Sequence, residues 1–482
     1  MPAADLQTFI AELEQRGWLR RITVEVDPVL EITEIADRVM KAGGPALLFE
    51  RVRGSPWPLL INTFGSRERM CLALGCTDFA ELADRVQALL KPEIPTTLMQ
   101  KLRKLPELAQ LGSLPPKIVR RGVCQEVVHA DDADLLALPA LKCWPQDGGR
   151  YITLGAVFTK DPETGERNVG MYRVQLFEPK LAAMHWHPHH DGARHFRRYR
   201  ERGQRMPLAI VLGGPAILPY AATCPLPPGV DECLFGGFLQ GQALELVPGV
   251  TQPDIEVPAT AEFVIEGYID PTEPLIREGP FGDHTGFYSL ADDYPRFHVT
   301  AITHRRRPIY PATIVGKPPM EDYWLGKATE RIFLPLLRMI VPDIIDYDLP
   351  LFGCFHNCAF VKIRKEYPYQ ARRVMSAIWG AGQMSLTKLI VVVDEHVDVH
   401  NQDEVLFQLC ANVDPRRDIM VVDGPLDILD HAAPACGAGS KLGIDATRKI
   451  AGEGVIRDWP AELEMTPEIK ARVDQRWREY GL

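Results

Sequence analysis

Two carboxylates flank a tight turn in the segment 278–286, which reads EGPFGDHTG. Glu278 and Asp283 are the two acids, and the Gly-Pro-Phe-Gly sequence between them favours a fixed, sharply turned backbone. Acids held at a constant separation suit proton-transfer chemistry, in which two carboxyl groups take different protonation states. The segment alone leaves one alternative open, a surface hairpin with two solvated acids.

A histidine-rich segment at 185–190 is the second candidate, because it holds four of the chain's 13 histidines. Clustered histidines favour metal or phosphate binding. The alternative is a solvated loop ahead of the arginine-rich helix that we expect near 191–203. The segment consists of His185, Trp186, His187, Pro188, His189 and His190.

The segment 167–173, RNVGMYR, places an amide and a guanidinium group on an expected strand. Strand alternation puts Asn168 and Tyr172 on one face and Arg173 on the other. An asparagine can offer a metal ion its amide oxygen, and the planar guanidinium group of Arg173 can hold a carboxylate or a phosphate. A hairpin strand with a surface arginine is the alternative.

Glu232 follows the sequence PPGVD, whose prolines fix the approach to the acid. A solvated loop acid is the alternative here. An amide oxygen, an imidazole and a carboxylate form a mixed ligand set that suits Mn²⁺ or Mg²⁺ better than a metal that prefers thiolates. With so few protein ligands, the metal would need others, such as the phosphate of a cofactor.

Composition narrows the class of protein. The 482 residues are too many for one core, so we expect two or three domains. A net charge of -10 disfavours a general nucleic-acid binder, and no apolar run reaches the roughly 18 residues of a transmembrane helix. The N-terminus lacks the apolar core of a signal peptide, and the ten cysteines form no CxxC pair. These features predict a cytoplasmic protein.

The elements that must position these residues fall into four segments. Residues 1–115 mix helices with short buried strands, and 116–320 read as a β-rich domain, a sandwich or a barrel. A helix expected within 321–345 links this domain to 346–482. There, strands alternate with helices, which predicts an α/β domain with a largely parallel sheet and a final helix.

Two short sequences resemble phosphate loops but fail on spacing. The segment 437–443, GAGSKLG, lacks the GxxxxGK[ST] pattern, so we expect a tight turn. The segment 326–329 lacks the first glycine and falls inside the linking helix.

Taken together, the chain resembles the UbiD family of decarboxylases, which use prenylated FMN. The likeness runs from about residue 5 to the C-terminus, and it is closest to the bacterial quinone-biosynthesis branch. It is carried by the phrases KAGGPALLFERV, DPETGERNVGMYR, GPFGDHTGFY, VGKPPMEDYWLGKATERIFLPLL and GSKLGIDATRK. The resemblance implies an α/β (α+β) chain with a central FMN-binding split β-barrel. A small N-terminal α/β region and a C-terminal α/β oligomerisation domain flank that barrel.

The resemblance also assigns roles to residues of this sequence. It implies a catalytic set of Arg173, Glu278 and Asp283, where some relatives have glutamate at the last position. Its metal ligands, for Mn²⁺, correspond to Asn168, Glu232 and a histidine, either His189 or His190; whether K⁺ is also bound is left open. Leu325 corresponds to a position near the substrate ring. Positions that hold the flavin correspond to Met171, Tyr172, Arg173, His185, Trp186, His187 and His190.

The function implied is the reversible, non-oxidative decarboxylation of an aromatic or α,β-unsaturated acid, with release of CO₂. Asp283 would deliver the proton if burial raises its pKa toward neutrality. The substrate is left open between a 3-polyprenyl-4-hydroxybenzoate, a naphthoate of the menaquinone route and a small phenolic or heteroaromatic acid. A flavin prenyltransferase would supply the cofactor, and a homodimer or homohexamer is expected. Rival interpretations are a metal-dependent hydrolase and a flavin-binding protein without chemistry.

Overall fold

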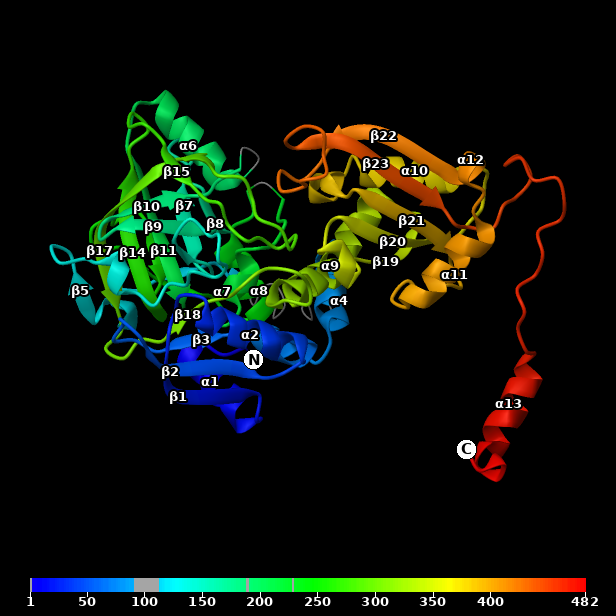
Figure 1. Ribbon diagram of the computed structural model, residues 1–482, viewed down its shortest axis with the longest axis horizontal. Helices are drawn as coiled ribbons and strands as arrows, with labels where there is room; N and C mark the ends of the chain where they lie inside the picture. The colour runs from blue at the N-terminus through cyan, green and yellow to red at the C-terminus, as the bar shows by residue number, and fades with distance from the viewer. Residues whose placement is uncertain (1, 91–111, 188–189, 228) are drawn as a thin grey trace, which may run out of the picture.

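A computed structural model describes residues 2–90, 112–187, 190–227 and 229–482 of the chain. It shows an N-terminal region packed beneath a β-rich central domain, and a separate C-terminal α/β domain (Figure 1). The long helix α9, Glu321–Ile340, connects the last two. The Pro- and Lys-rich sequence 101–122 predicts a linker to the central domain, and its residues 101–111 lie outside the described residues.

The N-terminal region is a four-stranded sheet with helices packed on it, in the order β1-β2-β3-β18. Its first helix, α1, forms because Leu6, Phe9, Ile10 and Leu13 recur on one buried face, while the Asp5 side chain accepts from the Thr8 N–H at the N-terminus. Its elements are α1 Leu6–Gln15, β1 Leu19–Val26, α2 Glu31–Lys41, β2 Ala46–Val52, β3 Leu59–Ile61, α3 Arg67–Leu74, α4 Phe79–Leu90 and β18 Tyr310–Pro311.

The central domain contains a nine-stranded sheet, mostly along the path β6-β9-β10-β17-β14-β11-β7-β8, with β5 paired to β17. All of its strand pairs are antiparallel, as expected for this part of the chain. The sheet strands are β5 Val127–His129, β6 Arg150–Ile152, β7 Ala156–Lys160, β8 Arg167–Met171, β9 Val174–Glu178, β10 Leu181–Met184, β11 Met206–Gly213, β14 Ala261–Ile269 and β17 Arg296–His304.

Shorter elements complete the central domain. The antiparallel pair β15–β16 carries the turn at 278–286, and β13-β12-β4 form a small separate sheet. These elements are β4 Lys117–Ile118, α6 Asp191–Glu201, α7 Leu218–Ala221, α8 Glu232–Gln240, β12 Glu245–Pro248, β13 Glu256–Pro258, β15 Ile276–Glu278 and β16 Asp292–Tyr294.

The nine-stranded sheet curls until its two ends approach each other. Strands β8 and β9 lie near opposite ends of the pairing order, yet only Tyr172 and Arg173 connect them in the chain. Three Cα–Cα steps span at most about 11 Å, so these ends must lie close together. The strand expected over 167–173 therefore stops at Met171, and Tyr172 and Arg173 lie at the seam of a curled half-barrel.

The C-terminal domain is a five-stranded sheet of order β19-β20-β21-β23-β22. The pairs β20–β21 and β21–β23 are parallel, but the edge pairs β19–β20 and β22–β23 are antiparallel, so the sheet is mixed and not largely parallel. Its elements are β19 Ile344–Asp348, β20 Cys358–Ile363, α10 Gln370–Ile378, β21 Leu389–Asp394, α11 Gln402–Asn412, α12 Pro415–Asp418, β22 Ile419–Pro425, β23 Ala438–Asp445 and α13 Pro467–Arg476.

The expected tight turn over 437–443 is wrong. Only Gly437 has a left-handed φ, +72°, and the residues after it form strand β23. Gly443 serves packing, because a Cβ there would come within 2.3 Å of Met375 Sδ and 3.1 Å of Trp379 on the α10 side. Gly443 therefore lets α10 approach β23, and the segment forms no phosphate loop.

The last helix, α13, stands away from the rest of the chain (Figure 1). None of its residues is buried, and large apolar side chains before and after it are exposed, among them Leu463 and Trp477. Within the described parts of the chain, no helix is both long enough and apolar enough to cross a membrane.

Candidate active site

Arg173 holds both acids of the turn at once. Its Nε donates to Glu278 Oε1 at 2.9 Å and its Nη2 to Glu278 Oε2 at 3.1 Å, which makes a two-pronged ion pair. Its Nη1 donates to Asp283 Oδ2. Glu278 is fully buried and the other two side chains nearly so. One guanidinium group at the barrel seam thus brings the two candidate acids together.

Residues in and next to the turn hold the guanidinium group of Arg173 in place. The Phe281 ring centroid lies 4.7 Å from Arg173 Cζ, a cation–π contact. Ser289 Oγ accepts from Arg173 Nη2 at 3.0 Å and from the Phe281 N–H at 3.2 Å. Asp147 Oδ1 accepts from the Gly282 N–H at 2.8 Å, which ties the turn to the loop ahead of β6. Packing and hydrogen bonds together fix the separation of the two acids.

The charge state of Asp283 differs from the expected one. Burial alone would raise its pKa, but the hydrogen bond from His284 and the charge of Arg173 outweigh burial and hold the pKa of Asp283 well below its usual range. Burial is likewise outweighed at Glu278, whose pKa is lowered by His185 and Arg173. Both acids are therefore ionised in this arrangement, and the expectation that burial raises the pKa of Asp283 is wrong.

Histidines of the segment 185–190 lie next to these acids. His185 Nδ1 is 3.1 Å from Glu278 Oε2, and its Nε2 is 2.8 Å from His187 Nε2. The rings of His187 and His190 stack with centroids 4.9 Å apart. The ring centroid of Tyr172 lies 5.1 Å from that of His190. Burial lowers the pKa of His185, which favours the neutral ring. His189 and Pro188 lie outside the described residues.

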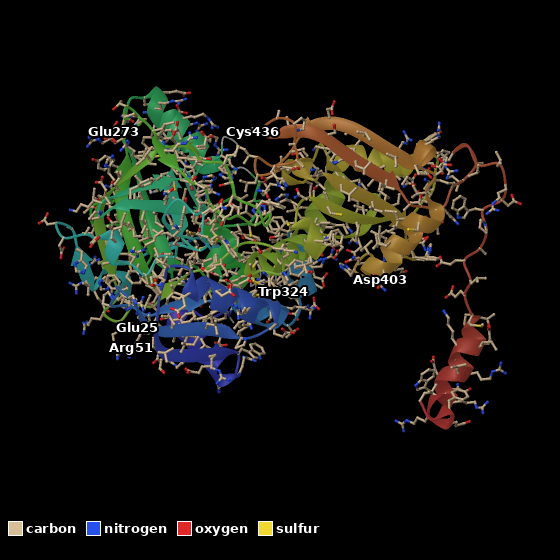
Figure 2. The ribbon with its side chains drawn as sticks, viewed as in Figure 1. Glu25, Arg51, Glu273, Trp324, Asp403 and Cys436 are labelled. Atoms are coloured by element: carbon tan, nitrogen blue, oxygen red, sulfur yellow. The ribbon has the colours of Figure 1, made fainter. Side chains whose placement is uncertain are left out.

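A cavity of about 990 Å³ opens between the central and C-terminal domains beside the ion pair. The C-terminal domain contributes Phe355, Leu386, Leu426, Asp427 and Cys436 to its wall. Cys436 lies on the side of that domain that faces the central domain (Figure 2). Predicted site residues that line the cavity are Asn168, Met171, Tyr172, Arg173, His185, His187, His190, Glu232 and Asp283.

Comparisons with known proteins assign the chain to a family. Three models of the 3-octaprenyl-4-hydroxybenzoate carboxy-lyase match it in chain order, the N-terminal domain over residues 10–89, the Rift-related domain over 117–318 and the C-terminal domain over 323–446. The chain belongs to the UbiD family. Its enzyme class is therefore that of the UbiD carboxy-lyases, as the resemblance implied, and its mixed α/β fold is shared with UbiD-class structures.

Relatives of known structure support this assignment. Vanillic acid decarboxylase of Sedimentibacter hydroxybenzoicus in closed form is 27% identical, with 100% of this chain and 99% of that chain covered and a TM-score of 0.86. An evolved dimeric form of the UbiD-class enzyme HmfF from Pelotomaculum thermopropionicum, in complex with prFMN, is 28% identical, with coverage of 97% and 98% and a TM-score of 0.79. An uncharacterized protein of Aquifex aeolicus is 51% identical over 480 residues, which is 99% of each chain.

Two residues at the predicted UbiD metal site fit a cation. Glu232 is buried, accepts from the Val169 N–H at 2.9 Å through Oε2, and has a pKa that burial raises to about 8. A buried carboxyl group in that state gains from a cation that restores its charge. Asn168 lies beside Val169, and its buried Nδ2 has no hydrogen-bond partner among the described residues, so the side-chain amide can turn to offer Oδ1 to a cation. The third predicted ligand, His189, lies outside the described residues.

Two predicted UbiD site residues stand apart from the cavity. Leu325 on α9 is 8% exposed and packs in the apolar core that the N-terminal region shares with this helix. Trp186 is buried in the central core, and its Nε1 has no hydrogen-bond partner among the residues that the structure describes. Their contacts with substrate and flavin stay predictions.

The structure adds residues that the sequence analysis did not single out. His284 follows Asp283, and its Nδ1 is 3.0 Å from Asp283 Oδ1. Its Nε2 is 2.8 Å from Nε2 of His356, which belongs to the C-terminal domain. His284 stands inside the turn motif and could have been chosen for that reason. His356 carries no local signal, because only the fold brings it to the turn.

Proposed function

We propose that this UbiD carboxy-lyase removes CO₂ reversibly from an aromatic or α,β-unsaturated acid, with prenylated FMN bound in the curled barrel. The observation that carries the proposal is Arg173, which holds Glu278 and Asp283 at the wall of a cavity large enough for a flavin and a small acid. The relative HmfF, solved with prFMN, supports the cofactor.

Residues around the cavity would hold the cofactor. The wall where the flavin ring would lie is lined by Met171, Tyr172, Arg173, His185, His187 and His190, and Trp186 packs behind it in the core against Tyr172. Mn²⁺ would bind Asn168, Glu232 and His189 or His190, together with the cofactor phosphate. When bound, prenylated FMN supplies an electron sink for the electrons of the carbon–carbon bond that breaks.

The chain's own residues would orient the acid and move the proton. A substrate carboxylate competes with Asp283 for the guanidinium group of Arg173, while the two-pronged bond keeps Glu278 paired. Once Arg173 no longer neutralises it, burial raises the pKa of Asp283 and favours proton uptake. Asp283 then gives this proton to the carbon that has lost CO₂, and the reverse direction takes it away.

The substrate class is the open part of the proposal. The family models are named for 3-octaprenyl-4-hydroxybenzoate, which favours a polyprenylated hydroxybenzoate or a naphthoate of quinone biosynthesis. The structural relative that acts on vanillic acid favours a small phenolic acid instead. The apolar wall of Phe355, Leu386 and Leu426 suits an aromatic ring in either case.

Two partners belong to the proposal. A flavin prenyltransferase would supply the cofactor. A second copy of the chain would cover the exposed tail around α13, which gives a homodimer or a homohexamer. The vanillic acid decarboxylase is known in a closed and an open form, and we infer that this chain also opens and closes.

Co-expression with a flavin prenyltransferase tests the proposed function. We expect purified protein with the absorbance of a modified flavin, bound manganese, and CO₂ release from at least one acid in a panel of 4-hydroxybenzoate, its polyprenylated form, vanillate, 3,4-dihydroxybenzoate and a dihydroxynaphthoate. A colourless protein that binds only zinc and hydrolyses esters or amides would instead favour the metal-dependent hydrolase.

A further inference from the structure

Each acid held by Arg173 is backed by a pair of histidines. Behind Glu278 stand His185 and His187, and behind Asp283 stand His284 and His356. In both pairs the first histidine faces the acid with Nδ1, and the two Nε2 atoms lie 2.8 Å apart. The pairs differ in one respect. The first lies within one loop of the central domain, whereas the second joins the turn to the C-terminal domain.

The second pair is built across the domain boundary. His284 stacks on the Phe355 ring with centroids 5.0 Å apart, and Phe355 precedes His356 in the loop before β20. Asp427, in the loop after β22, has Oδ2 3.7 Å from His356 Nε2. His284 also lines the cavity. The ring of His284 is thus held between Asp283 on one side and the C-terminal domain on the other.

A bound metal ion is the first explanation to weigh, since two imidazoles and one carboxylate gather here. Two imidazole nitrogens on a tetrahedral ion, each about 2.0–2.1 Å from it, lie roughly 3.3 Å apart. The observed Nε2–Nε2 separation of 2.8 Å is shorter and matches a hydrogen bond. One of the two rings must therefore carry the proton between them.

The surroundings decide which ring is protonated. Burial lowers the pKa of His284, but the hydrogen bond and charge of Asp283, with the charges of Asp322 and Asp427, outweigh burial and raise that pKa above its usual value. Burial and the neighbouring His284 lower the pKa of His356 to about 4, although Asp427 and Asp430 act against this. His284 is thus an imidazolium that donates through both nitrogens, and His356 is a neutral acceptor.

We propose that His284 stores the proton that Asp283 delivers, and that His356 is a positioning residue through which the C-terminal domain keeps this proton aimed at Asp283. The inference rests on the proposed function and deepens it. The Nδ1 proton of His284 passes to Asp283 Oδ1, and Asp283 passes it to the carbon that has lost CO₂. Neutral His284 then regains a proton at Nδ1 from water in the cavity. One proton is consumed for each CO₂ released, so the step balances.

A direct test uses the full-length purified protein with ¹⁵N-labelled histidine and needs no substrate. NMR titration should show the pKa of His284 above the ordinary 6.5, while His356 stays neutral over the same range. His356→Leu removes the acceptor for the Nε2 proton and should lower the pKa of His284, whereas His356→Gln keeps an acceptor and should restore it. A neutral His284 at pH 6, or a stoichiometric metal ion between the two rings, overturns the proposal.

Activity supplies the second readout. In cofactor-loaded enzyme, CO₂ release should fall with rising pH as His284 loses its proton, and His356→Leu should move this fall to lower pH by the same shift that NMR measures. His431→Leu is the matched control, because His431 contacts the turn from the same domain through Phe287, with ring centroids 4.1 Å apart, but does not touch Asp283. An unmoved pH profile in His356→Leu contradicts the inference. If no acid of the panel is decarboxylated, the proposed function fails, and the NMR result still decides the charge of His284.

Discussion

At the scale of single residues, the account depends on how Arg173 divides its hydrogen bonds. Glu278 takes two of them and is fully buried, whereas Asp283 takes one and faces the cavity and His284. The pair with one bond is the easier to break when a substrate carboxylate arrives. This difference assigns the anchoring role to Glu278 and the proton-carrying role to Asp283.

The sequence allowed prediction of the residues in this set, but not of the charge on Asp283. Glu278, Asp283 and Arg173 stand in recognisable motifs, so their presence could be predicted. The pKa of Asp283 depends on Arg173, 110 positions away, and on the geometry of His284. Spacing along the chain does not give the distance between these groups. The sequence therefore predicts that burial sets the pKa of Asp283, whereas the neighbouring positive charge sets it in the structure.

Glu232 offers a test at the same scale. We predict that Glu232→Gln loses bound flavin and manganese during purification, because the amide keeps the shape of the side chain but cannot carry a negative charge for the cation. Flavin absorbance and metal content per chain are the measurements. Glu273→Gln is the control, since this acid of the central domain pairs with His298 and neither residue lines the cavity or contacts Glu232. Full occupancy in Glu232→Gln would sink the ligand assignment.

At the scale of elements, charged side chains join α9 to the C-terminal sheet. Lys327 and Arg331 on α9 contact Asp348 and Asp346 of β19, and His400, in the loop ahead of α11, faces both acids at 2.9 and 3.2 Å. Three cationic groups thus fill the space between these acids. The network fixes the linking helix against the domain that carries His356.

His400 makes this network sensitive to pH. Hydrogen bonds to Asp346 and Asp348 raise its pKa to about 9 from the ordinary 6.5. A raised histidine pKa stabilises the folded state fully below pH 6.5, and the stabilisation is lost as pH rises through 9. Solvent reaches part of this side chain, so screening reduces the effect.

We predict that His400→Asn lowers the melting temperature at pH 6 and has little effect at pH 10. Thermal unfolding of both proteins across this range, followed by circular dichroism, measures the difference. His396→Asn serves as control, because His396 pairs with Glu462 on the surface. An equal deficit at both pH values would show that the positive charge of His400 contributes nothing to stability.

Element types could be predicted from the sequence more readily than their pairing. The helix over α9, the β-rich centre and the alternating C-terminal elements follow from periodicity. The mixed sheet did not, because an apolar run such as IMVV at 419–422 is the same whether its neighbouring strand runs parallel or antiparallel. The sequence predicts a turn at 437–443 because it does not show that Gly443 packs against Met375 and Trp379, which are distant along the chain.

At the scale of the whole molecule, the cavity lies between the central and C-terminal domains, and the tail that carries α13 stands away from both domains (Figure 1). The C-terminal domain closes one wall of the cavity with residues that the sequence analysis did not select, including Phe355, Asp427 and Cys436. Such walls cannot be predicted from one sequence, because their members share neither a motif nor a segment. The exposed apolar tail, in contrast, belongs to the C-terminal domain for which the resemblance implied a role in oligomerisation.

We predict that removal of residues 456–482 lowers the oligomeric state without unfolding the chain. No residue of α13 is buried against the rest of the chain, and the apolar side chains Leu463, Met465 and Trp477 of the tail are exposed. Light scattering coupled to size exclusion should show a smaller assembly, while circular dichroism stays native. Arg472→Glu, a charge change on the same tail, is the control. An unchanged mass after truncation would contradict the role of the tail.

The central claim is that Asp283 carries the proton in a prenylated-FMN-dependent decarboxylation. The most direct measurement is CO₂ release by cofactor-loaded wild type and Asp283→Asn on an acid that the wild type accepts. We predict that Asp283→Asn keeps the flavin spectrum and loses about 10²–10⁴-fold in turnover, the usual range for a general acid–base group. Turnover at the wild-type rate in Asp283→Asn, with the flavin bound, would contradict the account.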